Sequence, residues 1–323
     1  MKSLKRALCL ALVIASSVPP GFAWGNEGHR WINRAAALAM PNDYPQFMRE
    51  PLAIDQIEYL GPEPDRWRSV SEPSLKNAQE PDHFIDLELL EGFGPLPVKR
   101  YEFIARLEAF QREQTQKGTP EAKWLLPDKV GLQPWIVAEI WERLIVSFRE
   151  YRQLKTEGKP TLPAERAAIL YAGWLGHYVA DGSNPMHTTV QYNGWTGLNP
   201  NSYTTAKTTH SQFESNFVKD NVKAKEVETG LRKAKAIYAE EQTKAGGWQA
   251  EWDAYLGYLR ESNRLVEPLY QVEKAGGFNG TGTPEGHKFV VDRMHAGAQM
   301  LADLWYTAWI QSAVPAPEYK PGA

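Results

Sequence analysis

Two long segments with helical periodicity follow one another in the middle of the chain and constrain its fold. Residues 134–158 begin at Pro134 and end at Gly158, and residues 163–181 begin at Pro163. Proline is accepted in the first turn of a helix, and glycine commonly follows the last turn. The first segment is long enough to cross a globular domain, so this pattern favours a fold built from packed helices.

Other parts of the chain show the same period, and convincing alternating strands are absent. We expect further helices at residues 28–40, 101–118, 210–222, 223–243, 248–262 and 286–313. Runs rich in polar residues, glycine, proline and asparagine are typical of loops, and they occur at residues 61–80, 91–99, 191–209 and 275–286. The patterns predict one all-α domain over residues 24–323.

Residues 1–23 have the features of a secretory signal peptide. A basic segment at residues 2–6 precedes an apolar run that is too short to span a membrane. The small residues Gly21 and Ala23 then form a cleavage site. We therefore expect an exported protein, periplasmic or secreted, whose mature chain begins at Trp24. No later segment is long and apolar enough to cross a bilayer.

Removal of the signal peptide would also remove Cys9, which is the only cysteine. The mature protein would then have no disulfides and would depend on its core and on any bound metal. Three basic residues and no acidic ones would be lost, which changes the net charge from −3 to −6. An acidic chain lacks the basic field of a duplex-DNA binder, but it can act on phosphodiesters if metal ions supply positive charge.

Histidines and carboxylates occur at helical spacing in two places. His177 and Asp181 are four residues apart, as are His210 and Glu214, so each pair lies on one helical face. An imidazole and a carboxylate on one face can bind the same divalent ion, and zinc prefers such ligands. A proline two residues before His187 would end the first helix and turn this third histidine back toward the site. Each pair alone is more often a hydrogen bond than a metal site.

Four motifs follow one another in a defined order: WGNEGH at residues 24–29, HFID at 83–86, GHYVADGSNPMH at 176–187 and HSQFE at 210–214. With these motifs the chain resembles the superfamily of zinc-dependent phospholipases C and single-strand-specific zinc nucleases of fungi and plants. The resemblance implies an all-α secreted phosphodiester hydrolase with three zinc ions, whose mature chain begins with a metal-binding tryptophan.

The resemblance also implies which residues bind the three ions. The first ion would be bound by Asp65, His83, His177 and Asp181. The second would be bound by Asp181, His29 and the terminal amine and carbonyl of Trp24. The third would be bound by His187, His210 and Glu214. Asp181 would bridge the first two ions. The gap between Asp65 and His83 is longer than is usual in the superfamily, and Asp82 is the alternative ligand.

Several residues indicate a nuclease. By resemblance, Arg68 matches an arginine that faces the scissile phosphate, where a planar cation suits the developing charge. Phe84 and Asp86 match an aromatic residue that stacks on a base and an acid that binds the base. Asp65 would orient the attacking water or take its proton, so Asp65 and Arg68 are the predicted catalytic residues. We therefore predict a nuclease that cleaves single-stranded DNA or RNA with a zinc-activated hydroxide.

Other features favour a phospholipase C acting on phosphatidylcholine-type lipids. Residues 29–35 resemble the phospholipase helix, and Glu214 replaces the aspartate more usual in the nucleases. The loop at residues 188–209 lacks the double-glycine-asparagine stretch expected of a nuclease. Against a lipid substrate, Glu80 occupies the position of an aromatic residue that helps to enclose choline in the phospholipases. A secreted binding protein that uses zinc only for stability is a third alternative.

Overall fold

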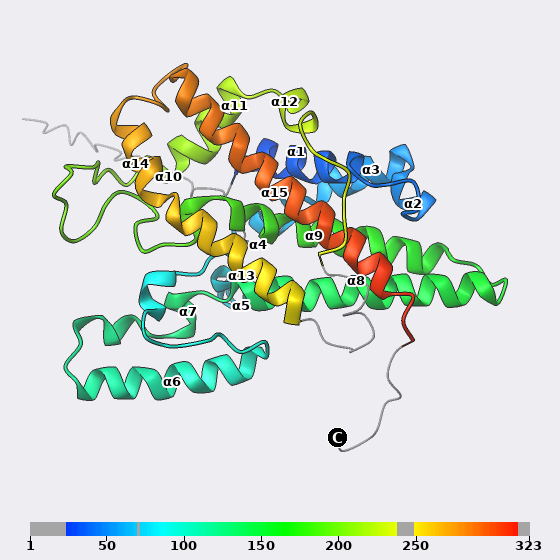
Figure 1. Ribbon diagram of the computed structural model, residues 1–323, viewed down its shortest axis with the longest axis horizontal. Coiled ribbons are helices and arrows are strands. Elements are labelled where there is room, and N and C mark those ends of the chain that lie inside the picture. The colour runs from blue at the N-terminus through cyan, green and yellow to red at the C-terminus, as the bar shows by residue number, and fades with distance from the viewer. Residues whose placement is uncertain (1–23, 70–71, 238–248, 316–323) are drawn as a thin grey trace, which may run out of the picture.

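The computed structural model describes residues 24–69, 72–237 and 249–315, which form helices joined by turns and loops (Figure 1). These residues contain no β-strand, which confirms the predicted all-α fold. The predicted signal peptide, residues 1–23, lies outside the described residues. In the part of the chain that the structure describes, no helix combines the length and the apolar character needed to cross a membrane.

The longer helices are α1 (Gly25–Leu38), α3 (Pro51–Leu60), α6 (Arg100–Gln116), α8 (Gln133–Thr156), α9 (Leu162–Ser183), α13 (Gln249–Arg264), α14 (Val266–Lys274) and α15 (Pro284–Gln311). The shorter ones are α2 (Gln46–Arg49), α4 (Glu63–Ser69), α5 (Pro73–Gln79), α7 (Pro127–Val130), α10 (Thr209–Ser211), α11 (Phe217–Asn221) and α12 (Ala224–Glu228). The helices expected at residues 28–40, 101–118, 134–158, 163–181, 248–262 and 286–313 are α1, α6, α8, α9, α13 and α15, with ends within three residues of those expected.

Helix α9 lies at the centre of the bundle and packs against α1, α3, α8 and α15 (Figure 1). Its apolar residues recur every three or four positions, and Ala168, Ala172 and Leu175 are fully buried. On the facing helix α8, Trp141 and Phe148 are buried as well. The two long segments that dominate the sequence pattern therefore form the core of the domain.

Two glycines of α9 allow α1 and α3 to approach closely. A Cβ atom at Gly176 would lie 1.8 Å from Asn33 Oδ1, and one at Gly173 would lie 2.5 Å from Leu60 Cβ. The Asn33 amide donates to the backbone oxygens of Ile57 and Gly173 at 2.9 and 3.0 Å. This junction fixes the three helices together and brings the histidines of α1 and α9 side by side.

The prediction of a loop at residues 61–80 is wrong, because α4 and α5 occupy most of this segment. Pro64 and Pro73 suggested a loop, but they occupy the second position of α4 and the first of α5. A proline in the first turn costs no intrahelical hydrogen bond, since the first N–H groups of a helix have no partner within it.

The prediction of a helix at residues 223–243 is wrong beyond α12, which ends at Glu228. Residues 229–237 have no regular structure, and 238–243 lie outside the described residues. The backbone N–H of Lys235 donates to Asp303 of α15 at 2.9 Å. Hydrogen bonds to a neighbouring helix here replace the local bonds that the periodic pattern predicted.

Replacement of Gly173 by alanine should lower the free energy of unfolding by about 1–3 kcal/mol, because α3 and α9 must separate to admit the methyl group. Gly257→Ala is the matched control: Gly257 lies in α13, and an added methyl group there would meet no neighbouring atom within 4 Å. That change should raise stability by about 0.5–1 kcal/mol. Denaturant titration measures both, and equal effects would contradict the tight junction.

Candidate metal centre

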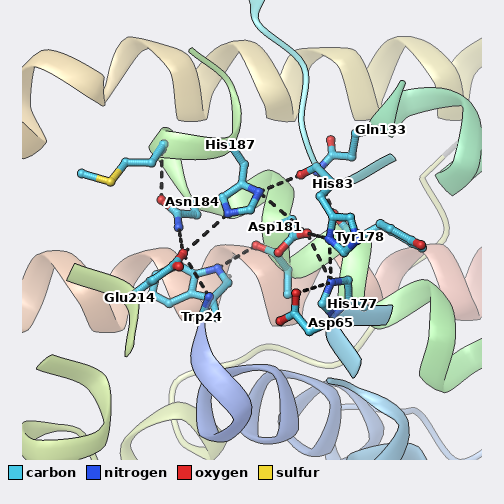
Figure 2. Close-up of polar contacts among 12 residues, drawn as sticks. Trp24, Asp65, His83, Gln133, His177, Tyr178, Asp181, Asn184, His187 and Glu214 are labelled. Carbon is cyan, nitrogen blue, oxygen red and sulfur yellow. Dashed lines mark hydrogen bonds and ion pairs between the residues drawn. The ribbon is translucent and has the colours of Figure 1, made fainter. Parts of the chain in front are cut away.

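Helix α9 carries two of the predicted zinc ligands. His177 and Asp181 lie one helical turn apart, are fully buried, and point into one cluster of polar side chains (Figure 2). The helix ends at Ser183, and Asn184 is extended with ψ 117°. The 3₁₀ turn Pro185–His187 then returns His187 to the same cluster, as the proline in the motif predicted.

A first group of candidate ligands combines α9 with two segments from earlier in the chain. His177 Nε2 lies 3.0 Å from Nδ1 of His83, which ends the 3₁₀ turn Glu80–His83, and 3.9 Å from Oδ1 of Asp65 in α4. His83 Nδ1 is also 3.1 Å from Asp181 Oδ2. The ligand atoms of Asp65, His83 and His177 all lie within 4.8 Å of one another. One metal ion can therefore contact all three.

A second group includes His29 of α1. The rings of His29 and His177 are stacked, with their centroids 4.0 Å apart. His29 Nε2 lies 3.4 Å from Asp181 Oδ1 and 3.8 Å from Asp65 Oδ2. The ligand atoms of His29, His177 and Asp181 again lie within 4.8 Å of one another. Asp181 contacts both groups, which is the position that a bridging carboxylate requires.

Trp24 lies at the start of α1 and is fully buried. Its indole Nε1 donates to the backbone oxygen of Ala180 at 2.7 Å and to Ser183 Oγ at 3.1 Å. Its backbone nitrogen donates to Glu214 Oε2 at 3.2 Å. The indole therefore anchors Trp24 to α9. The resemblance assigns the main-chain nitrogen to the ion of His29 and Asp181, but in the structure this nitrogen contacts Glu214 (Figure 2).

A third group forms where residues 209–221 pack against α1. His210 Nε2 lies 3.2 Å from His187 Nε2 and 2.8 Å from Glu214 Oε2. Glu214 lies in the π-helical turn Gln212–Asn216, an uncommon conformation that often occurs at functional sites. The ligand atoms of the two histidines and Glu214 also lie within 4.8 Å of one another.

Hydrogen bonds to backbone carbonyls orient three of the histidines. The Nδ1 atoms of His177, His187 and His210 lie 2.9, 2.7 and 2.9 Å from the backbone oxygens of Gly61, His83 and Tyr192, respectively. A carbonyl can only accept, so each Nδ1 carries the proton and each Nε2 presents a lone pair to the cluster. Histidines that bind metals are usually oriented in this way.

The electrostatics of the cluster favour a bound cation. Burial raises the pKa of Asp65 to about 7, although Arg68 opposes the shift. Burial, and then the charge of Asp65, raise the pKa of Asp181 well above its usual value. Among the described residues, Asp181 Oδ1 and Glu214 Oε1 are buried without a hydrogen-bond partner. Burial also lowers the pKa of His83, so this imidazole is neutral at pH 7 and can bind a metal.

The structure distinguishes Asp65 from its alternative. Asp82 is buried too, and burial raises its pKa to about 7, with Arg100 opposing the shift. Its Oδ1, however, accepts a hydrogen bond from Arg100 Nη1 at 3.1 Å. Asp65, and not Asp82, belongs to a group of candidate metal ligands.

Of the other predicted site residues, Arg68 contacts the cluster directly. Arg68 Nη1 lies 3.4 Å from Asp65 Oδ1, and its side chain is 19% exposed, so it can also reach a bound anion. Phe84 is half-buried and lies against Gly131. Asp86 is 9% exposed, and burial, followed by the charge of Glu88, raises its pKa to about 8.

Two residues that sequence reasoning did not assign to the site also contact it. The Asn184 amide donates to Glu214 Oε2 at 2.9 Å, and Asn184 Oδ1 accepts from the backbone N–H of Met186. The ring of Tyr178 lies 5.2 Å from the rings of both His83 and His177. Asn184 lies inside the motif GHYVADGSNPMH, so its position in the sequence could have indicated that it belongs to the site. Nothing in the sequence around Tyr178 distinguishes it from a tyrosine of the core.

No protein family model and no curated protein matches this chain. Among solved structures, the alpha toxin from Clostridium absonum is similar with a TM-score of 0.47 and 13% identity, covering 91% of this chain and 67% of that one. The alpha-toxin from an avian strain of Clostridium perfringens is similar with a TM-score of 0.40 and 14% identity, covering 90% and 64%. This chain therefore spans about two thirds of the length of these toxins.

Replacement of Asp65 by asparagine should lower the zinc content by about one ion per chain, because an amide is a poor zinc ligand. Asp82→Asn is the matched control, since this buried aspartate pairs with Arg100 outside the cluster. Elemental analysis after dialysis against a weak chelator measures the zinc content, and thermal melts measure folding separately. Loss of zinc from the Asp82 variant alone would contradict the assignment.

Proposed function

We propose that this chain is an exported, zinc-dependent phosphodiester hydrolase of the superfamily that its motifs resemble. The observation that carries the proposal is the orientation of His177, His187 and His210, whose Nε2 lone pairs converge on buried carboxylates. Nitrogen and carboxylate oxygen ligands suit zinc. Three groups of ligands share this cluster, and we propose one zinc ion for each, with His177 binding the ion of Asp65 and His83 and with Asp181 shared by the first two ions.

Zinc, when bound, lowers the pKa of a water molecule to roughly 7 and attracts the negative phosphate. The residues of the chain supply the rest of the chemistry. Asp65 is proposed to orient the attacking water and hold its proton, and Arg68 contacts one of its oxygens. Arg68 is partly exposed, so its guanidinium can also donate to the phosphate oxygens as charge develops on them.

Trp24 is proposed to contribute its own amine. If the signal peptide is removed after Ala23, the backbone nitrogen that faces Glu214 becomes a free amine inside the cluster. A neutral amine is a nitrogen ligand like an imidazole. The burial of the indole against α9 would hold this terminus in place.

We propose a phospholipid, rather than nucleic acid, as the substrate. A protein that grips a nucleic acid backbone normally presents lysine and arginine along it. Residues 188–206, which make up most of the loop that joins His187 to α10, contain no Asp, Glu, Lys or Arg, and Lys207 follows them. A loop without a row of cations suits a zwitterionic headgroup better than a polyanion.

A nuclease remains the second candidate, because the HFID segment runs along the site. The backbone N–H of Ile85 donates to the oxygen of His187 at 2.9 Å, and that of Leu87 to Thr188 at 3.2 Å. Phe84 and Asp86, the predicted base-binding residues, therefore lie next to the third group of ligands in this segment.

The direct test is hydrolysis of phosphatidylcholine by the zinc-loaded chain beginning at Trp24, followed as release of phosphocholine. Arg68→Ala should lower kcat/KM by about 10²–10³. Arg66→Ala, in the same helix but paired with Glu63 and lying over the ring of Tyr59, should change it less than about twofold.

The parallel assay measures acid-soluble nucleotides released from single-stranded DNA and RNA. Release from nucleic acid alone would replace the phospholipase with the nuclease. No hydrolysis of either substrate by the zinc-loaded protein would reject both and leave a zinc-stabilised binding protein.

One extra residue before Trp24 should cut activity at least tenfold, because the amine becomes an amide that cannot bind zinc as a neutral donor. The comparison is between two zinc-loaded chains that differ only in this residue, with zinc content measured for both. Equal activity and equal zinc content would show that the terminal amine is not a ligand.

A further inference from the structure

The loop at residues 188–206, here called the rim loop, differs in composition from the rest of the protein. Charged residues make up 23% of the chain, yet this segment contains none. It contains Tyr192, Trp195, Leu198 and Tyr203 instead. In Figure 1 it extends beyond the helices at one end of the molecule, between α9 and α10.

Hydrogen bonds and aromatic contacts fix the base of the rim loop. The N–H of Trp195 donates to the Thr204 oxygen at 2.7 Å, which closes the loop on itself. The Trp195 ring lies 4.8 Å from that of Tyr203 and 5.2 Å from that of Tyr270 in α14. The Tyr270 hydroxyl donates to the oxygen of Gln191 at 2.6 Å. The loop is therefore held against α14 by its aromatic residues.

The tip of the rim loop exposes an apolar side chain. Leu198 is 93% exposed, and its backbone oxygen accepts a hydrogen bond from the Trp195 indole at 2.9 Å. Gly197 beside it has φ 74°, a conformation that keeps the tip turned tightly. Tyr192 is also more than half exposed. A braced loop thus presents a leucine to the surroundings with aromatic residues behind it.

The rim loop is attached directly to the metal centre. It begins after His187 and ends a few residues before His210, so it joins two ligands of the third group. His210 Nδ1 donates to the Tyr192 oxygen at 2.9 Å, and its backbone N–H donates to Asn193 Oδ1 at 3.2 Å. An external surface, such as a membrane, that contacts the tip of this loop therefore lies close to the metal centre.

We propose that the rim loop docks the protein on a phosphatidylcholine bilayer, with Leu198 entering the apolar region and Tyr192 and Trp195 lying at the headgroup level. Tryptophan and tyrosine favour that level, and leucine favours the acyl chains. The uncharged loop matches a zwitterionic surface. The chain itself is acidic, with a formal net charge of −3 that becomes −6 without residues 1–23, so it offers an anionic surface no general attraction. This inference rests on the proposed phospholipase function and adds how the substrate is reached.

Cosedimentation with vesicles tests the docking separately from hydrolysis. The zinc-loaded protein is mixed with vesicles of a phosphonate analogue of phosphatidylcholine, in which the bond to be cleaved is P–C. Leu198→Asp should weaken binding about tenfold or more, because an apolar contact is lost. Leu52→Asp is the matched control: Leu52 is 83% exposed but lies in α3, and its replacement should change binding less than twofold.

The same variants separate the docking from the proposed chemistry. For Leu198→Asp, hydrolysis of vesicles relative to hydrolysis of monomeric short-chain phosphatidylcholine should fall about tenfold. Equal binding by both leucine variants, or binding that requires anionic lipid, would overturn the docking and leave the hydrolase in place. Binding that depends on Leu198 without any hydrolysis would keep the docking and reject the proposed function. Concentration-dependent self-association that is lost in Leu198→Asp, without vesicle binding, would assign the loop to a second copy instead.

Discussion

Three carboxylates buried at one point are the constraint on which the rest of the structure depends. Asp65, Asp181 and Glu214 are almost fully inaccessible and lie among histidines, and burial lowers the pKa of two of these, His83 and His177. A buried carboxylate is costly to ionise without a compensating charge, and burial raises the pKa of both Asp65 and Asp181. Divalent cations remove this cost and would stabilise the fold, which matters in a mature chain predicted to have no cysteine.

The candidate ligands come from segments that are far apart in the sequence, so the fold and the centre depend on each other. Helix α1 supplies His29, α4 supplies Asp65, and the π-helical turn supplies Glu214. Gly173 and Gly176 let α1 and α3 reach α9, and this packing aligns the side chains before any ion binds. Ligands held by such packing lose little entropy on binding a metal.

Local spacing was enough to predict part of the centre. The pairs His177–Asp181 and His210–Glu214 follow from the period of one helix, although the second pair lies partly in a π-helical turn. The choice between Asp65 and Asp82 could not be made from spacing, because it depends on Arg100 of a distant helix. The irregular course of residues 229–237 depends in the same way on hydrogen bonds to α15. Long-range contacts decide these features.

X-ray diffraction at the zinc absorption edge, from crystals of the chain beginning at Trp24, tests the central claim most directly. The account predicts three anomalous peaks, two of them on opposite oxygens of Asp181 and the third among His187, His210 and Glu214. A single peak, no peak, or a peak beside Asp82 would contradict it.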